Sequence, residues 1–221
     1  MKLSLGIIAG LVLMSGMAQA ADPTEKGARP YVGLYGGVAI PETIDNVSQR
    51  VAGTTVQLSD LKLQTGPIVG LKLGILGSDK DTVARWFGLE LDVSYLQSNI
   101  KDQDIRLTLG NLSGTIRGEE TRVRMITGAA HVLVRFSNGP IQPYIGAGPA
   151  VVHARISESN TFAAGNSTTL GLSAVGGIRF AFSDHIGGFL EYKHIRSELE
   201  FDTAQGDAVI HAGVGGIHFM F

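Results

Sequence analysis

The last stretch of the chain, Val209 to Phe221, constrains the fold more than any other. Its sequence, VIHAGVGGIHFMF, alternates as a β-strand does, and Ile217, Phe219 and Phe221 fall on one face. An unprotected strand with such a face is an adhesive edge, which soluble proteins avoid. The pattern is best explained by a strand that closes a barrel and turns these side chains towards lipid.

The beginning of the chain predicts export. A positive residue, Lys2, precedes a short apolar run and a small-residue cleavage site, Ala-Gln-Ala. The run is too short to cross a bilayer as a helix. We therefore predict a signal peptide at residues 1–20, a short periplasmic lead-in at 21–29 and one barrel domain at 30–221.

Composition excludes several classes of function. The chain has no cysteine, so disulfides and thiol chemistry are excluded. Its 18 basic and 20 acidic residues give no footprint for nucleic acid. The 6 histidines show no metal-binding spacing, and the glycines lie inside strands rather than in phosphate loops. No metal, cofactor or catalytic residue is therefore expected.

Eight segments alternate with period two between turn residues. The connections after the first, third, fifth and seventh are long and polar, whereas the others are short. Long outer loops, short periplasmic turns and periplasmic termini are typical of outer-membrane barrels. The predicted fold is all-β, an eight-stranded antiparallel up-and-down transmembrane β-barrel. Its strands are expected at about 30–40, 63–76, from 86 past 100, up to 136, 143–157, 169–182, 185–197 and 209–221.

Four of these segments carry charge on one face and apolar residues on the other. In the third, Glu90 and Asp92 alternate with Leu89 and Leu91. Alternation alone also fits a two-sheet sandwich or a soluble lipocalin-like barrel. The aromatic closing strand and the export signal favour a barrel with a polar lumen, although the lumen face of the fifth segment is not assigned. The predicted lumen charge network is Lys72, Glu90, Asp92, Arg179, Glu191 and Lys193.

Short motifs resemble the eight-stranded transmembrane domain of outer membrane protein A and related opacity-type surface proteins. GGIRFAFSDHIGGFLEYKH is similar to its sixth and seventh strands, and FGLELDVSY and GLKLGILG to its acidic and lysine strands; PYIGAGPAV is a phrase of the wider family. The resemblance implies a bacterial outer-membrane location and a charge-plugged lumen. It also implies that the closing segment with Ile217, Phe219 and Phe221 is read by the barrel-insertion machinery. Arg179 replaces a glutamate of that family, so the charge pairing must differ.

The short turn between the second and third segments predicts their pairing. Paired residue numbers should sum to about 162, which places Lys72 opposite Glu90, with Asp92 one diagonal step away. Across the turn between the sixth and seventh segments, Arg179 should lie within diagonal reach of Glu191.

The outer end carries further expectations. Residues 104–109 and 114–117 alternate around a turn-like segment, which predicts a hairpin between the third and fourth strands, and residues 56–63 are expected to lengthen the second strand. Arginine binds phosphate well, and outward parity continues above the apolar band of the fourth strand. The predicted lipopolysaccharide phosphate contacts are Arg122, Arg124, Arg196 and His211.

These features favour a non-catalytic structural or surface-interaction protein in contact with outer-membrane lipid and lipopolysaccharide. Two alternatives stay open: a narrow gated solute or ion pore, and a lipid A-modifying enzyme. An eight-stranded interior is just wide enough for side chains, so a pore requires the plug to open. Ser137 in RFSNG is similar to a motif of lipid A deacylase barrels, but Arg135 stands at the catalytic histidine, so the general base is missing. The sequence does not identify a ligand of the outer loops.

Overall fold

A computed structural model describes most of the chain from residue 27 onwards. Residues 1–26, with the predicted signal peptide and most of the lead-in, lie outside the described residues. Among the residues described, no helix combines the length and apolar character needed to cross a bilayer. The described residues are 27–42, 47–51, 54–59, 64–78, 83–100, 103–109, 112–118, 121–137, 139–156, 165–201 and 204–221.

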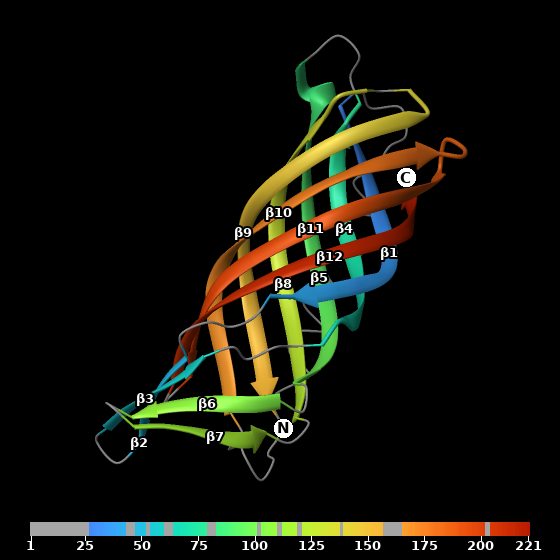
Figure 1. The fold of residues 1–221 in the computed structure, drawn as a ribbon. Coiled ribbons are helices and arrows are strands. Elements are labelled where there is room, and N and C mark those ends of the chain that lie inside the picture. Colours follow the sequence, from blue (N-terminus) through green and yellow to red (C-terminus); the bar gives the residue numbers. More distant parts are fainter. Residues whose placement is uncertain are drawn as a thin grey trace, which may run out of the picture.

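Eight long strands form a closed antiparallel barrel (Figure 1). Each pairs with the next barrel strand along the chain, and β1 pairs with β12 to close the ring. This confirms the predicted eight-stranded up-and-down fold. The barrel strands are β1 (Ala28–Pro41), β4 (Gly66–Gly77), β5 (Phe87–Ile100), β8 (Thr121–Arg135), β9 (Ile141–Ile156), β10 (Gly165–Ala181), β11 (Ile186–Phe201) and β12 (Ala204–Met220).

The C-terminal strand closes the barrel along its whole contact with β1. Pairing runs from Tyr31↔Met220 to Pro41↔Ile210, and the Phe221 amide donates to the Pro30 carbonyl at 3.0 Å. Neither strand is therefore left with a free edge along this seam, which satisfies the backbone groups that lipid cannot. The side chains of Ile217, Phe219 and Phe221 all point outwards.

The two ends of the barrel differ. At one, the short-turn end, β4 and β5 are joined through a 3-10 turn, η1 (Val83–Trp86), and β10 and β11 through residues 182–185. At the other, the long-loop end, a small four-stranded sheet extends beyond the barrel (Figure 1). It consists of β2 (Val47–Val51), β3 (Thr54–Ser59), β6 (Gln103–Leu109) and β7 (Leu112–Gly118), and β2 attaches it to the start of β12.

The structure confirms one loop prediction and corrects two. The predicted hairpin is present as β6 and β7, which pair from Gln103↔Gly118 to Leu109↔Leu112. β3 does not lengthen β4, because its backbone pairs with β2 on one side and β6 on the other. The connection after β11 is not long either, since β11 and β12 stay paired as far as Phe201↔Ala204.

Alternation along each strand separates the lumen from the outer surface. On β5, Glu90 and Asp92 are buried, whereas Leu89 and Leu91 are exposed on the outside. The same rule assigns the face of β9 that the sequence leaves open: Tyr144 and Val152 are buried, so even-numbered residues face the lumen. The outer surface is apolar and the interior carries the charges, which is the arrangement of a barrel solvated by lipid.

Candidate functional site

Side chains fill the lumen in successive layers, and β4 contributes one side chain to each layer. From the long-loop end to the short-turn end, its buried side chains are Ile68, Lys72 and Leu76. Lys72 belongs to the charged layer, which we define as the six residues of the predicted network. Leu76 belongs to the inner cluster, with Tyr31, Leu133, Tyr144 and Val175. Ile68 belongs to the apolar layer: Tyr35, Ala39, Ile68, Leu96, Val123, Met125, Val152, Ala154, Phe189, Ile195, Ile210, Ala212 and Val214.

Glu90 is the most connected carboxylate of the charged layer. Its Oε1 accepts from Lys72 Nζ at 2.8 Å, and its Oε2 accepts from the Tyr31 hydroxyl at 2.5 Å. Arg179, which comes from β10 across the lumen, donates to the same Oε2 at 3.1 Å and stacks over the Tyr31 ring at 4.3 Å. The Glu90 side chain is fully buried, so these donors replace the water it would otherwise bind.

The other two carboxylates complete the layer. Asp92 accepts from Lys193 Nζ at 2.7 Å and from the Tyr35 hydroxyl at 2.7 Å. Glu191 accepts from Lys72 Nζ at 2.8 Å and from the Tyr144 hydroxyl at 2.6 Å. Three cations and three carboxylates thus lie together, and each carboxylate also accepts from a tyrosine. The tyrosines were missed from the sequence because they lie on β1 and β9, which carry no charge in this layer.

The pairing of β4 with β5 differs from the prediction by one diagonal step. Lys72 lies directly opposite Asp92, and Gly74 lies opposite Glu90. The reason is η1: its residues form a 3-10 turn instead of joining the ladder, so pairing begins at Leu76↔Gly88. Lys72 nevertheless reaches Glu90 diagonally, and its Nζ lies 3.3 Å from Asp92.

The pairing of β10 with β11 places Arg179 opposite Phe189, so Glu191 is one diagonal step from Arg179. The ion pairs do not follow this neighbourhood. Arg179 pairs with Glu90 of β5 across the lumen, and Glu191 pairs with Lys72 of β4. The narrow interior brings opposite walls within ion-pair distance, and a sequence argument based on adjacent strands alone does not capture this.

Glycines on the lumen face make room for the tyrosine rings. A Cβ built on Gly74 would lie 2.5 Å from the Tyr31 ring, and one on Gly70 would collide with the Tyr35 ring. The lumen-facing glycines of β4 are therefore sockets for two tyrosines that donate to the carboxylates. Their role is the close approach of side chains rather than backbone freedom.

Two clusters in the lumen have the composition of chemical sites. The ligand atoms of Glu90, Asp92 and His131 lie within 4.8 Å of one another, as a metal site requires. Both carboxylates, however, already bind the Lys72 ammonium, which a metal ion would have to displace. His131 also contacts the Ser173 hydroxyl at 2.9 Å, which gives a Glu-His-Ser order, but Ser173 is buried and does not line the cavity described below.

The Ser137 motif forms a turn. The Ser137 hydroxyl accepts from the Gly139 amide at 3.1 Å, as a turn-forming serine does. Arg135, two residues before Ser137 on the lumen face of β8, donates to the Gly77 carbonyl at 2.5 Å and to the Arg85 carbonyl. Arg135 therefore ties the short turns together and offers Ser137 no base.

The structure places the four predicted rim residues in different surroundings. Arg124 points outwards from β8 and lies directly opposite the outward Arg155 of β9, a residue that the sequence analysis missed because the face of β9 was unassigned. Arg196 is exposed on β11. His211 is bonded to the Tyr192 hydroxyl and, at 2.7 Å, to Glu42. Arg122 lies opposite Asn99, and its side chain is outside the described part.

A closed barrel with an apolar outer surface and a charged, filled lumen is the architecture of a bacterial outer-membrane protein. The model of the outer membrane protein beta-barrel domain matches residues 7–216. The chain therefore belongs to this family, and its place is the bacterial outer membrane. No match is found among curated protein sequences.

Solved structures with the same architecture share little sequence with this chain. Neisserial surface protein A is 15% identical, over 88% of this chain and 99% of its own, with a TM-score of 0.56. OprG from Pseudomonas aeruginosa is 13% identical, over 88% of this chain and 97% of its own, with a TM-score of 0.52. The outer membrane protease OmpT from Escherichia coli also matches, with 8% identity, 87% and 97% coverage and a TM-score of 0.47. At identities this low, the two matches with TM-scores above 0.5 establish the fold alone.

Proposed function

We propose that this protein is a non-catalytic outer-membrane barrel that presents its long-loop end, including the β2–β3–β6–β7 sheet, at the cell surface. The observation that carries the proposal is the filled lumen. The charged layer closes it with mutually paired side chains, and the apolar layer closes it again towards the long-loop end. A barrel filled in this way serves as a membrane anchor for the sheet and loops at its long-loop end.

The pore alternative receives less support. An open path needs the three ion-paired carboxylates to separate from Lys72, Arg179 and Lys193, and it also needs the apolar layer to move. Removing one partner from a buried ion pair costs about 3–5 kcal/mol. Polar pore linings conduct because water solvates the ion. Buried hydroxyl residues such as Ser94, Ser98 and Thr127 share this part of the lumen, but the hydrocarbon side chains of the apolar layer pack into one cluster beside them.

The enzyme alternative is not supported by any of the described serine clusters. Ser137 has no base beside it, and Ser173 is buried within the charged layer. A lipid-modifying serine must meet both a base and a lipid-accessible surface. The Glu90-His131-Ser173 contacts are better explained as satisfaction of buried polar groups.

The orientation and partners follow from the same proposal. The short-turn end with both ends of the barrel sequence faces the periplasm, and the long-loop end faces outwards. The outward row of Ile217, Phe219 and Phe221 is the feature that the insertion machinery would recognise, and the rim arginines Arg124 and Arg155 face the level of lipopolysaccharide phosphates.

Three measurements test the proposal. Folded protein in planar bilayers should give no discrete conductance steps, whereas reproducible single-channel steps would favour the pore. Lipid A isolated from overexpressing cells should keep its mass. A lower mass would indicate deacylation and favour the enzyme. Protease added to intact cells should cleave tags inserted in residues 157–164 and should not cleave tags beside Gly139. The opposite pattern would reverse the orientation.

A further inference from the structure

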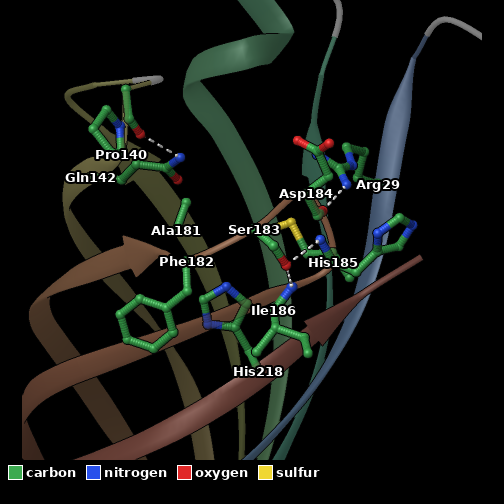
Figure 2. Close-up of a pocket in the computed structure, with 12 residues that line it drawn as sticks. Arg29, Pro140, Gln142, Ala181, Phe182, Ser183, Asp184, His185, Ile186 and His218 are labelled. Atoms are coloured by element: carbon green, nitrogen blue, oxygen red, sulfur yellow. Dashed lines mark hydrogen bonds between the residues drawn. The ribbon is translucent and has the colours of Figure 1, made fainter.

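We propose that the short-turn mouth of the barrel binds a small oxyanion, a phosphate or carboxylate group, in a cavity beside Arg29 and His218. The cavity has a volume of about 410 Å³ and is lined by β1, β9, the β10–β11 turn and β12. Figure 2 shows Arg29, Gln142 and His218 around it, with Arg29 held by the turn through a hydrogen bond to the Asp184 carbonyl.

The guanidinium groups of Arg29 and Arg135 at this mouth outnumber the one carboxylate that lines the cavity, Asp184, in contrast to the balanced charged layer. Arg29 and Arg135 both face the lumen here. Their hydrogen bonds among the described residues go to neutral acceptors: the Asp184 carbonyl for Arg29, and the Gly77 carbonyl, the Arg85 carbonyl and the Gln142 amide oxygen for Arg135. Neither forms an ion pair with a carboxylate in the described part of the chain. Carbonyl dipoles compensate a guanidinium charge only in part, so an anion is attracted to this region.

A buried nitrogen atom in the cavity wall lacks a partner. His218 lines the cavity and is 5% exposed, and within the described residues its Nδ1 makes no hydrogen bond. Arg135 Nε and Arg179 Nη1 are also unpaired there, although neither residue lines the cavity. Gln142 lies between these two arginines and the cavity, because it lines the cavity, pairs with Arg179 on β10 and contacts Arg135 at 3.4 Å. Buried polar groups are nearly always paired, so the unpaired His218 nitrogen in the cavity wall beside Arg29 indicates a polar ligand.

The lining also limits the chemistry of that ligand. Guanidinium groups bind planar or tetrahedral oxyanions through paired N–H donors, which suits phosphate and carboxylate. Ile186 and Met220 add an apolar wall, so the anion can carry an apolar substituent. Free phosphate and the phosphate of a phospholipid headgroup at this end of the barrel both meet these requirements.

The test uses the folded full-length protein in octyl glucoside, a detergent without phosphate. Inorganic phosphate is titrated while the 31P signal and the urea unfolding midpoint are followed. We expect saturable binding that Arg29→Gln and His218→Gln weaken at least tenfold. Arg106→Gln, which removes an equal charge from β6 at the opposite end, should leave the affinity unchanged. Non-saturable binding, or equal weakening by Arg106→Gln, would overturn the site.

A second arm separates the two sources of phosphate. The same variants are placed in vesicles of digalactosyldiacylglycerol, a bilayer lipid without phosphate, with and without phosphatidylglycerol. Stabilisation by phosphatidylglycerol that is lost in Arg29→Gln assigns the site to a lipid headgroup, whereas stabilisation by added phosphate alone assigns it to a soluble anion. Absence of both effects refutes the proposal. Because Arg29 is only partly buried, the comparison of Arg29→Gln with Arg106→Gln decides the question even if His218→Gln does not fold.

Discussion

Ile68 and Lys72 lie on the same face of β4, and both are at most 2% exposed, yet they are buried by different means. Ile68 sits in the apolar layer, where any well-fitting hydrocarbon side chain satisfies the site. Lys72 sits in the charged layer, where its ammonium contacts Glu90, Asp92 and Glu191. The apolar layer therefore depends on volume, whereas the charged layer depends on the identity and position of each partner.

The difference shows how a narrow barrel can be both filled and specific. Packing alone tolerates several arrangements of similar volume. A buried charge tolerates very few, because moving it from its partner leaves it without compensation. We infer that the charged layer fixes the relative positions of β4, β5, β10 and β11, and that the apolar layer fills the space above it.

The largest expected effect is in the charged layer. Glu90→Gln removes the charge that faces Lys72 and Arg179, so we expect the free energy of unfolding to fall by about 3–5 kcal/mol. Urea unfolding in lipid vesicles measures it. The control is Glu42→Gln, an exposed carboxylate bonded to His211, which should cost about 0–1 kcal/mol. Similar losses in the two variants would show that the charged layer is not the specific part of the lumen.

The apolar layer should respond to lost volume. Ile68→Ala leaves a cavity in the lumen and should cost about 2–4 kcal/mol. Val69→Ala, on the next residue, removes side-chain volume from the lipid-facing surface, where acyl chains refill the space, and should cost about 1 kcal/mol. Equal costs in the same unfolding assay would mean that the apolar layer is not tightly packed.

The glycine sockets connect packing to the charges. Gly74→Ala places a methyl group 2.5 Å from the Tyr31 ring, which must then move away from Glu90, and should cost about 1–3 kcal/mol. Gly128→Ala meets no atom within 4 Å and is the matched control. Tyrosine fluorescence and urea unfolding follow the two variants, and a neutral Gly74→Ala would remove Tyr31 from the argument.

Much of the fold was predictable from the sequence because lipid imposes strict alternation. Each outward position of a strand such as β5 must be apolar, so Leu89 and Leu91 identify the outside and Glu90 and Asp92 the lumen. The closing strand was equally clear from its aromatic end. The face of β9 was not, because small residues occupy both of its faces, and Arg155 was missed for that reason.

The pairing of the charges was less predictable. A prediction of strand pairing depends on where the turn between the strands ends. Because of the η1 turn, the residue directly opposite Lys72 is Asp92 rather than the predicted Glu90, a difference of one diagonal step. The ion pair of Arg179 with Glu90 crosses the lumen, so the order of strands along the chain gives no indication of it. Sequence reasoning found the six charged residues of the layer, but their partners depend on the diameter and curvature of the closed barrel.

Charge at the outer rim should behave in the opposite way from charge in the lumen, and with the smallest effect. Arg124 and Arg155 lie directly opposite each other on adjacent strands, and like charges in that position repel. In phosphate-free detergent, Arg124→Gln should therefore raise the free energy of unfolding by about 0.2–1 kcal/mol. Arg196→Gln is the control, since Arg196 lies opposite Leu172 and Val209, and it should give no gain.

Lipopolysaccharide should reverse the sign of this effect. A phosphate between the two guanidinium groups accepts from both and turns their repulsion into shared binding. In vesicles that contain lipopolysaccharide, the wild-type protein should therefore be more stable than Arg124→Gln, and added salt should reduce the difference because the rim is exposed. Arg155→Lys keeps the charge but loses the planar fork, so it should keep only part of the stabilisation. If Arg124→Gln gives the same gain in the free energy of unfolding with and without lipopolysaccharide, Arg124 and Arg155 do not bind its phosphates. The exposed arginines would then lack the charged partners that the buried cations have within the lumen.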